Sequence, residues 1–528
     1  MDAFFRHVPV LLVFLTLSAA SWLHGGTRTE AMLPVIPWLW AILFEVLLFF
    51  PQRRPYENPV AARERAWHGL GRDPLLYVTL IFIVLISVPF LNRGLCPICD
   101  YPEIMKGRSP DPGISFAPSC VNLADHFNVV LWFVPALTAM LAARHALSHG
   151  GKRLLMEMLV WNAAALAVLG FIQQASGAEA PLWIKSAEKG LFFSTFGYVN
   201  MGGAYFAMMF AFAVGVWLTR VAEVAKMPPI DKGLSVPQQL LFRFIHAHYP
   251  LVPAALIMYA VLATLCRAAM LNMIVLAALA FLYYECALFF ARSNRAKNLK
   301  KAAVGMIGGV LVVISMFIFG PEQWTRELQT ITSREVLDRT SGKSQYHSRV
   351  AMAILKDKKP LGHKDAALPT PDRPLVTGPN WSRILFGVGG WGYKHLCTNY
   401  MTPDELRQLQ SLGGANVHND YLQFLCEHGL VGLVLLVIIY LLLVVPIFRS
   451  WFKLYRAACF MRTDASPPSP RVLYCLPAGT FWILLGNVAM LICASGDCPL
   501  RSLAVLSALF VSLACADGYL PREQGARR

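Results

Sequence analysis

Twelve apolar runs, spread over most of the chain, constrain its fold more than any other feature of the sequence. Each is close to the roughly 20 residues that an α-helix needs to cross the hydrocarbon core of a bilayer. A hydrophobic share of 56% and a mean hydropathy of +0.50 also exceed what soluble proteins show. We therefore expect an all-α, polytopic membrane protein with about twelve transmembrane helices. The runs are 8–23, 31–50, 75–91, 127–143, 154–172, 199–219, 251–266, 268–291, 302–320, 429–448, 473–494 and 501–517.

The distribution of basic residues predicts which helix ends face the cytoplasm, because cytoplasmic loops are enriched in Lys and Arg. With the N-terminus inside, the cytoplasmic segments hold more than half of the 47 basic residues, and the short outer segments hold few. This predicts two cytoplasmic termini, with helices one to nine in 1–320, an outer loop at 321–426 and helices ten to twelve in 427–528. The first run is counted as a retained span and not as a cleaved signal peptide.

The net charge of +16 is shared among all the predicted cytoplasmic segments. Charge distributed in this way indicates contact with anionic membrane lipid. Nucleic acid is not an expected partner, because no single segment concentrates the basic residues.

Five of the twelve cysteines fall on the predicted outer side, where disulfides can form. Cys96 and Cys99 have the spacing of a redox site, a disulfide or half of a zinc site. Only Cys120 lies nearby in sequence, so a zinc site with four ligands is not evident. We expect a local structural disulfide. The other two outer cysteines are Cys397 and Cys498.

The long outer loop is expected to contain short helices at 322–338, 347–358 and 403–411. Residues 359–382 are rich in Pro, Lys and Asp and read as an irregular, mobile insertion. Near the end of the loop, His418 opens a polar helix that continues into the tenth span.

His418 is the candidate proton acceptor. Histidine exchanges protons near neutral pH, and the free N–H groups at a helix start favour anions. Glu427 lies nine residues further on, on the opposite side of that helix, and is expected to be structural. The alternative for His418 is a histidine hydrogen-bonded into a loop.

Arg267 and Arg349 are candidate anion-binding residues on the same side of the membrane. Arg267 lies at a tight turn between the seventh and eighth runs, where a charge near the bilayer is costly unless it is paired. It either extends to lipid phosphate or binds an anionic substrate through its planar guanidinium. Arg349 lies on a loop helix, where a solvated surface arginine is the alternative.

Several segments, in order, resemble the O-antigen ligase and polymerase family. His418, Asn419 and Leu422, followed by the Glu427-x-Gly-x-x-Gly pattern at the start of a span, carry the strongest likeness. The other segments are Phe196–Ala207, similar to a Gly-Asn-x-Asn motif, Cys266-Arg267-Ala268, Ser348-Arg349, and Phe386–Gly389, similar to a glycine-containing turn. Tyr198-Val199 departs from the family's Asn-Pro.

The resemblance implies a GT-C-like membrane glycosyltransferase that moves a glycan from a polyprenyl diphosphate to an acceptor, with inversion and without metal or cofactor. It assigns His418 as the base and Arg267 and Arg349 to the diphosphate. Substrate contacts are expected from Asn419, Asn200 and Gly389, the last in a turn where glycine lets the backbone approach a neighbour or a ligand.

The expected location is the bacterial inner membrane, with the site facing the periplasm. The acceptor is a glycolipid in ligases, a growing glycan in polymerases, or a protein hydroxyl in related enzymes, and the sequence does not separate them. A flippase for a lipid-linked glycan is the alternative from another class, although transporters usually carry charges near the middle of their spans.

Overall fold

The computed structural model describes residues 2–27, 33–54, 57–92, 114, 116–184, 192–227, 235–290, 334–356, 380–401, 416–460 and 476–521. Structural statements below concern these residues. They are helical, and the β-type pairing found among them is an isolated bridge between Phe193 and Phe196. The expected all-α class is confirmed for this part of the chain.

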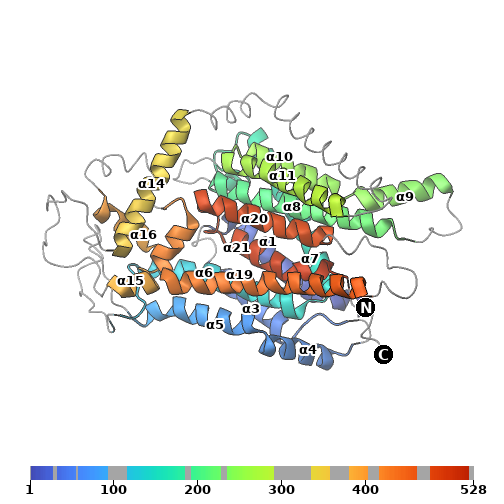
Figure 1. Cartoon of the computed structure of the whole chain (residues 1–528), viewed down its shortest axis with the longest axis horizontal. Helices are drawn as coiled ribbons and strands as arrows, with labels where there is room; N and C mark the ends of the chain where they lie inside the picture. Colours follow the sequence, from blue (N-terminus) through green and yellow to red (C-terminus); the bar gives the residue numbers. More distant parts are fainter. Residues whose placement is uncertain are drawn as a thin grey trace.

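Eleven of the twelve predicted apolar runs overlap helices, and the run 302–320 lies outside the described residues. Figure 1 shows these helices packed in one bundle. They are α1 (Asp2–Trp22), α3 (Ile36–Leu48), α5 (Pro74–Ser87), α6 (Leu123–Leu141), α7 (His149–Ala175), α8 (Val199–Val224), α10 (Leu251–Ala263), α11 (Arg267–Phe290), α19 (Asp420–Phe460), α20 (Ala478–Gly496) and α21 (Leu503–Cys515).

Six helices of the described part are long and apolar enough to cross a membrane. A seventh is added if α4 (Pro59–Arg72) and the following segment to Phe90, bent by 67°, are one span. These helices are compatible with a polytopic membrane protein, and the count of twelve spans stays a prediction. The six are Leu123–Ala146, His149–Ala175, Val199–Val224, Val236–Ala263, Asp420–Arg456 and Ala478–Gly496.

Helices α8, α20 and α21 form the centre of the bundle. All residues of α21 are buried. Glycines bring α8 and α20 together: a Cβ added at Gly215 would lie 2.9 Å from the Trp482 Cβ, and one at Gly486 would lie 2.9 Å from the Phe212 ring. Small residues allow such close backbone approach between membrane helices, which fixes the ends of α8 and α20 relative to each other.

The two ends of the bundle are told apart by the contacts and helix ends that lie there. At one end, which we call the far end, ion pairs join helices: Lys152 contacts Asp517 at 2.8 Å, and Arg220 contacts Glu157 at 2.6 Å. At the other end, which we call the cap end, α8 and α11 begin and α20 finishes.

Short helices from the long loop cover the cap end (Figure 1). We call them the cap; they are α14 (Arg334–Lys356), α15 (Asn380–Phe386), α16 (Gly392–Leu396) and η5 (Cys397–Tyr400). The cap has a small core of its own, in which Val350 and Ile354 of α14 pack with Tyr393, Leu396 and Val417. This core is separate from that of the bundle, so the cap is a distinct layer over the helix ends.

Several predicted boundaries in the loop were wrong. The helix expected at 347–358 begins earlier, at Arg334, and the end of the segment 359–382 is not irregular, because α15 begins at Asn380. The predicted helix 403–411, and the larger part of 322–338, lie outside the described residues. Cys96 and Cys99 also lie outside them, whereas Cys120, Cys397 and Cys498 are buried free thiols.

Candidate active site

His418 precedes a helix and does not open it. Helix α19 begins at Asp420, and the side chain of Asn419 accepts a hydrogen bond from the Leu422 N–H at 3.0 Å, as a capping asparagine does. His418 itself has a positive φ of 54°. The prediction of a helix starting at His418 was therefore wrong by two residues, and Asn419 has a structural role as the cap. A substrate contact for Asn419 stays a prediction.

His418 is paired with an acid that the sequence did not single out. Its Nδ1 atom lies 3.3 Å from the Oδ1 atom of Asp497, at the end of α20. The side chain of His418 is 29% exposed, whereas Asp497 is buried. A carboxylate bonded to one ring nitrogen selects the tautomer that leaves the other nitrogen free to accept a proton.

Asp497 collects hydrogen bonds from several elements. Asn200 donates to its Oδ2 at 2.6 Å, the Tyr198 hydroxyl donates to it at 3.1 Å, and the Cys498 backbone N–H donates to its Oδ1 at 2.8 Å. Burial raises the pKa of Asp497, but the bonds from His418, Cys498 and Asn200 outweigh it and hold the pKa below its ordinary value. Asp497 is therefore ionised around neutral pH.

Asn200 thus has a visible partner. Besides Asp497 it contacts the Tyr198 hydroxyl at 2.8 Å, so the tyrosine that departs from the family pattern belongs to the same hydrogen-bond network. The side-chain amide of Asn200 already donates to Asp497 and helps to hold it in place. A substrate contact for Asn200 stays a prediction.

Arg349 lies on the cap helix α14. Two residues before it on α14, the buried His347 lies 2.7 Å from the Tyr393 hydroxyl, and the rings of His347 and His418 are 5.6 Å apart. Burial raises the pKa of Tyr393, and the nearby charge of Arg349 lowers it only partly. The guanidinium of Arg349 also lies 5.9 Å from the Tyr346 ring. Arg349 itself is exposed and, two residues from His347 on a helix, lies on a different face from it. A contact between Arg349 and the diphosphate stays a prediction.

Arg267 is the first residue of α11, as the predicted turn requires. The preceding Cys266 packs so closely on α8 that a Cβ at Gly203, three residues after Asn200, would lie 2.7 Å from its Cβ. Asn272 then fastens α11 to α20 by donating to the Ala489 carbonyl at 2.9 Å. The structure thus brings the helix starts that carry Arg267 and Asn200 to the cap end, beside Asp497.

The glycine-containing turn at Phe386–Gly389 supports a bend in α19. Gly429 interrupts that helix with φ 66° and ψ −174°, and the turn donates to carbonyls just before the bend, from Val388 to Cys426 at 3.0 Å and from Gly389 to Glu427 at 2.8 Å. Packing also requires glycine at Gly389, where a Cβ would lie 2.4 Å from the Cβ of Cys120. Substrate binding by Gly389 stays a prediction.

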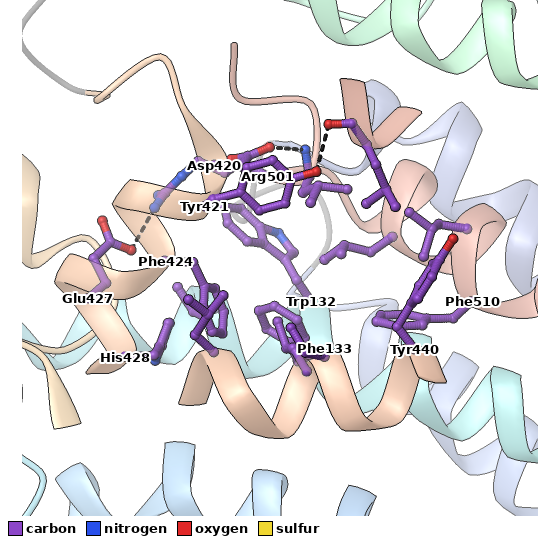
Figure 2. Close-up of a pocket in the computed structure, with 18 residues that line it drawn as sticks. Trp132, Phe133, Asp420, Tyr421, Phe424, Glu427, His428, Tyr440, Arg501 and Phe510 are labelled. Carbon is purple, nitrogen blue, oxygen red and sulfur yellow. Dashed lines mark hydrogen bonds and ion pairs between the residues drawn. The ribbon is translucent and has the colours of Figure 1, made fainter. Parts of the chain in front are cut away.

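A cavity of about 210 Å³ lies beside the site, between α6, α19, α20 and α21. Figure 2 shows aromatic side chains such as Trp132 and Phe424 around it, with Asp420, Glu427 and Arg501 also in its wall. Arg501 and Glu427 form a buried ion pair at 2.6 Å. Glu427 thus has a buried partner, its expected structural role stays a prediction, and the cavity offers an apolar space next to polar groups.

One group of side chains has the makeup of a metal site. Ligand atoms of His418, Asp497 and Cys498 all lie within 4.8 Å of one another. Burial and the charge of Asp497 raise the pKa of the Cys498 thiol well above its ordinary value, so the free thiol is protonated. It contacts Oδ1 of Asp497 at 3.4 Å.

Sequence reasoning missed Asp497, His347, Tyr198 and the pairing of Arg501. The sequence did contain a signal for Asp497 and Arg501. Asp497 lies in the short outer segment between the last two apolar runs, and Arg501 is the first residue of the last run, where a charge close to the membrane needs a partner. No comparable signal marks His347 or Tyr198.

Comparison of the chain with protein-family models gives no match, and comparison with curated proteins gives none either. The case for function therefore depends on the geometry described above and on the ordered motifs.

Proposed function

We propose that this protein is a membrane glycosyltransferase that moves a glycan from a polyprenyl diphosphate to an acceptor hydroxyl on the outer face of the cytoplasmic membrane, in the manner of an O-antigen ligase. The observation that carries the proposal is the pair His418–Asp497, with its nitrogen–oxygen distance of 3.3 Å, at the cap end of a membrane helix bundle. The arginine-bearing helices α11 and α14 reach the same end.

In this proposal, the Nδ1–H of His418 donates to the ionised Asp497, and Nε2 takes the proton of the acceptor hydroxyl. The oxygen then attacks the anomeric carbon as the bond to the diphosphate breaks, and the diphosphate leaves with the electron pair. The configuration at the anomeric carbon is inverted. A positioned base of this kind contributes about 10²–10⁴-fold to a rate, and the Asp497 contact keeps the ring oriented.

Arg267 and Arg349 provide fixed positive charge for the leaving diphosphate. Arginine stays protonated and donates in pairs to phosphate oxygens, which makes it suited to this task. The proposal therefore predicts that lysine does not replace either arginine fully. The apolar cavity along α19 provides space for part of a lipid chain of the carrier or the acceptor.

The decisive experiment is reconstitution of purified protein with a lipid-linked glycan and an acceptor. His418→Ala is expected to insert and fold normally and to lose transfer. His246→Ala, at the far end, is the matched control and should transfer at the wild-type rate. Full transfer by His418→Ala would refute the base assignment, and glycan translocation without transfer by the wild-type protein would identify a flippase instead.

The same donor serves ligases and polymerases, so the acceptor needs its own experiment. In a deletion strain, loss of all surface-linked glycan supports the proposed ligase. Single repeat units remaining on the acceptor would identify a polymerase, and loss of glycan from proteins alone would identify a protein glycosyltransferase.

A further inference from the structure

Three potential metal ligands converge on one point at the cap end. The same carboxylate atom, Oδ1 of Asp497, lies 3.3 Å from Nδ1 of His418 and 3.4 Å from Sγ of Cys498. A neutral histidine, a carboxylate and a thiolate are the ligand types that zinc takes in proteins. Asp497 and Cys498 are adjacent in sequence, and His418 comes from the start of another helix.

The two separations to Asp497 fit a tetrahedral ion, and all three ligand atoms lie within 4.8 Å of one another. Zinc binds nitrogen and oxygen at about 2.0–2.2 Å and sulfur at about 2.3 Å, which places neighbouring ligand atoms roughly 3.3–3.6 Å apart. Hydrogen bonds have similar lengths, and the contacts of Oδ1 with the His418 and Cys498 side chains are of that kind here, each made through a single proton, beside the Cys498 N–H that also donates to Oδ1. One divalent cation can take the place of both protons without moving the three side chains far.

Surrounding groups also meet the needs of a metal site. Ligating carboxylates in metal sites are usually held by further hydrogen bonds, and Oδ2 of Asp497 already accepts from Asn200 at 2.6 Å and from Tyr198 at 3.1 Å. The side chain of His418 is 29% exposed, which gives an ion access from one side and leaves a fourth position for water.

We propose that His418 Nδ1, Asp497 Oδ1 and Cys498 Sγ form a Zn²⁺ site, and that zinc bound there switches off the base. Binding releases the thiol proton of Cys498 to solvent. It also requires the Nδ1 lone pair of His418, so the ring proton moves to Nε2. A protonated Nε2 cannot accept a proton from an acceptor hydroxyl. The inhibitory part of this inference depends on the proposed transferase function, whereas the binding part does not.

Binding is tested first, with Co²⁺ as the probe on the full-length protein in detergent or nanodiscs. We expect one bound Co²⁺ with a near-ultraviolet sulfur-to-cobalt charge-transfer band, displaced by Zn²⁺ but not by Mg²⁺, because the nitrogen and sulfur donors favour the softer metals. Cys498→Ser should abolish the band, and Asp497→Asn should weaken metal binding by roughly 10-fold or more. Cys120→Ser, which removes another buried thiol, should keep it.

Absence of the band in the wild-type protein, or its persistence in Cys498→Ser, would overturn the site. Inhibition is tested second, as the ratio of transfer rates with and without Zn²⁺. Zn²⁺ should slow transfer at least tenfold for the wild-type protein and for Cys120→Ser. It should slow transfer by Cys498→Ser much less. If cobalt binds at Cys498 but zinc leaves transfer unchanged, the inhibitory role is wrong. If no transfer is seen under any condition, the proposed function fails while the metal site stands.

Discussion

Asp497 is the residue on which the contacts of the candidate site converge, and its replacement is the sharpest test at the scale of single residues. Asp497→Asn keeps the size of the side chain but removes the charge that orients His418. We expect transfer to fall by up to the ~10²–10⁴-fold attributed to a positioned base, mainly in kcat. The measurement is steady-state kinetics of glycan transfer in proteoliposomes.

Asp125→Asn is the matched control for that experiment, because Asp125 bonds His395 on the cap at 2.7 Å and has no contact with His418. The double variant Asp497→Asn/His418→Ala should be no slower than His418→Ala alone, since residues that act as a unit are not additive. Additive losses would show that Asp497 acts independently of the histidine.

The buried pair Glu427–Arg501 gives a stability prediction. The side chains are 1% and 8% exposed, so Glu427→Ala leaves a guanidinium buried without its carboxylate. Breaking such a pair by removing one partner costs about 3–5 kcal/mol, and the thermal unfolding temperature in detergent should fall clearly. Glu427→Leu/Arg501→Met, which removes both charges, should restore much of it, and an unchanged single variant would contradict this account.

Residue-scale prediction from sequence singled out side chains that carry their own chemical signal, and their roles stay predictions. His418 and Arg267 were noticed because titratable groups near an apolar run are costly, and Arg349 because its loop helix resembles a family motif. Asp497 was missed because its partner is 79 residues away and belongs to another helix. A pairing of that kind depends on how the helices pack, and local sequence does not specify it.

Among the elements, the end of α15 and the bend of α19 are in backbone contact at two glycines, Gly387 and Gly429. A Cβ at Gly429 would lie 2.3 Å from the Leu385 carbonyl carbon, and its φ of 66° with ψ of −174° belongs to a region that only glycine populates. We expect Gly429→Ala to destabilise the protein by at least about 1–3 kcal/mol and to loosen the cap. Thermal unfolding and limited proteolysis of the cap measure these effects.

Gly71→Ala is the control for this contact, because a Cβ there meets no atom within 4 Å and alanine favours a helix interior by about 0.5–1 kcal/mol. Equal behaviour of the two variants would argue that Gly429 has no special role.

The boundary errors of the sequence reading have a local cause. The helix start was placed two residues too early because several polar residues around His418 could each begin a helix. Asn419 is a good capping residue, and it is the one that caps α19. The bend at Gly429 was likewise signalled by a glycine inside a helical pattern, but only the contact with α15 explains why the helix breaks there.

For the whole molecule, the two ends of the bundle lead to a topology prediction. Glu179, exposed at the cap end, and Lys226, exposed at the far end, flank α8 and its neighbours. With the cap outside, a membrane-impermeant maleimide should label Glu179→Cys in intact cells and label Lys226→Cys only after lysis. The unmodified protein gives the background, since its described cysteines are buried. The reverse pattern would place the cap in the cytoplasm.

The helical class and the places of eleven apolar runs were predictable, because runs of apolar residues are a property of the sequence alone. The number of spans was not. α3 and α21 each have only 13 residues, and α21 is buried on all sides by other helices. Hydropathy cannot separate a helix surrounded by protein from one surrounded by lipid, because both environments are apolar.

Helix α19 has a consequence for the membrane in which the protein works. The span Asp420–Arg456 has 37 residues, which at 1.5 Å per residue is about 55 Å of helix for a hydrocarbon core of about 30 Å. With the helix close to upright, so that tilt does not accommodate its length, we expect the surplus to project from the bilayer, and the part before Gly429 accounts for about 13 Å of it. His418, at the tip of this projection, is therefore held at a set height above the lipid, and a thicker bilayer would submerge it.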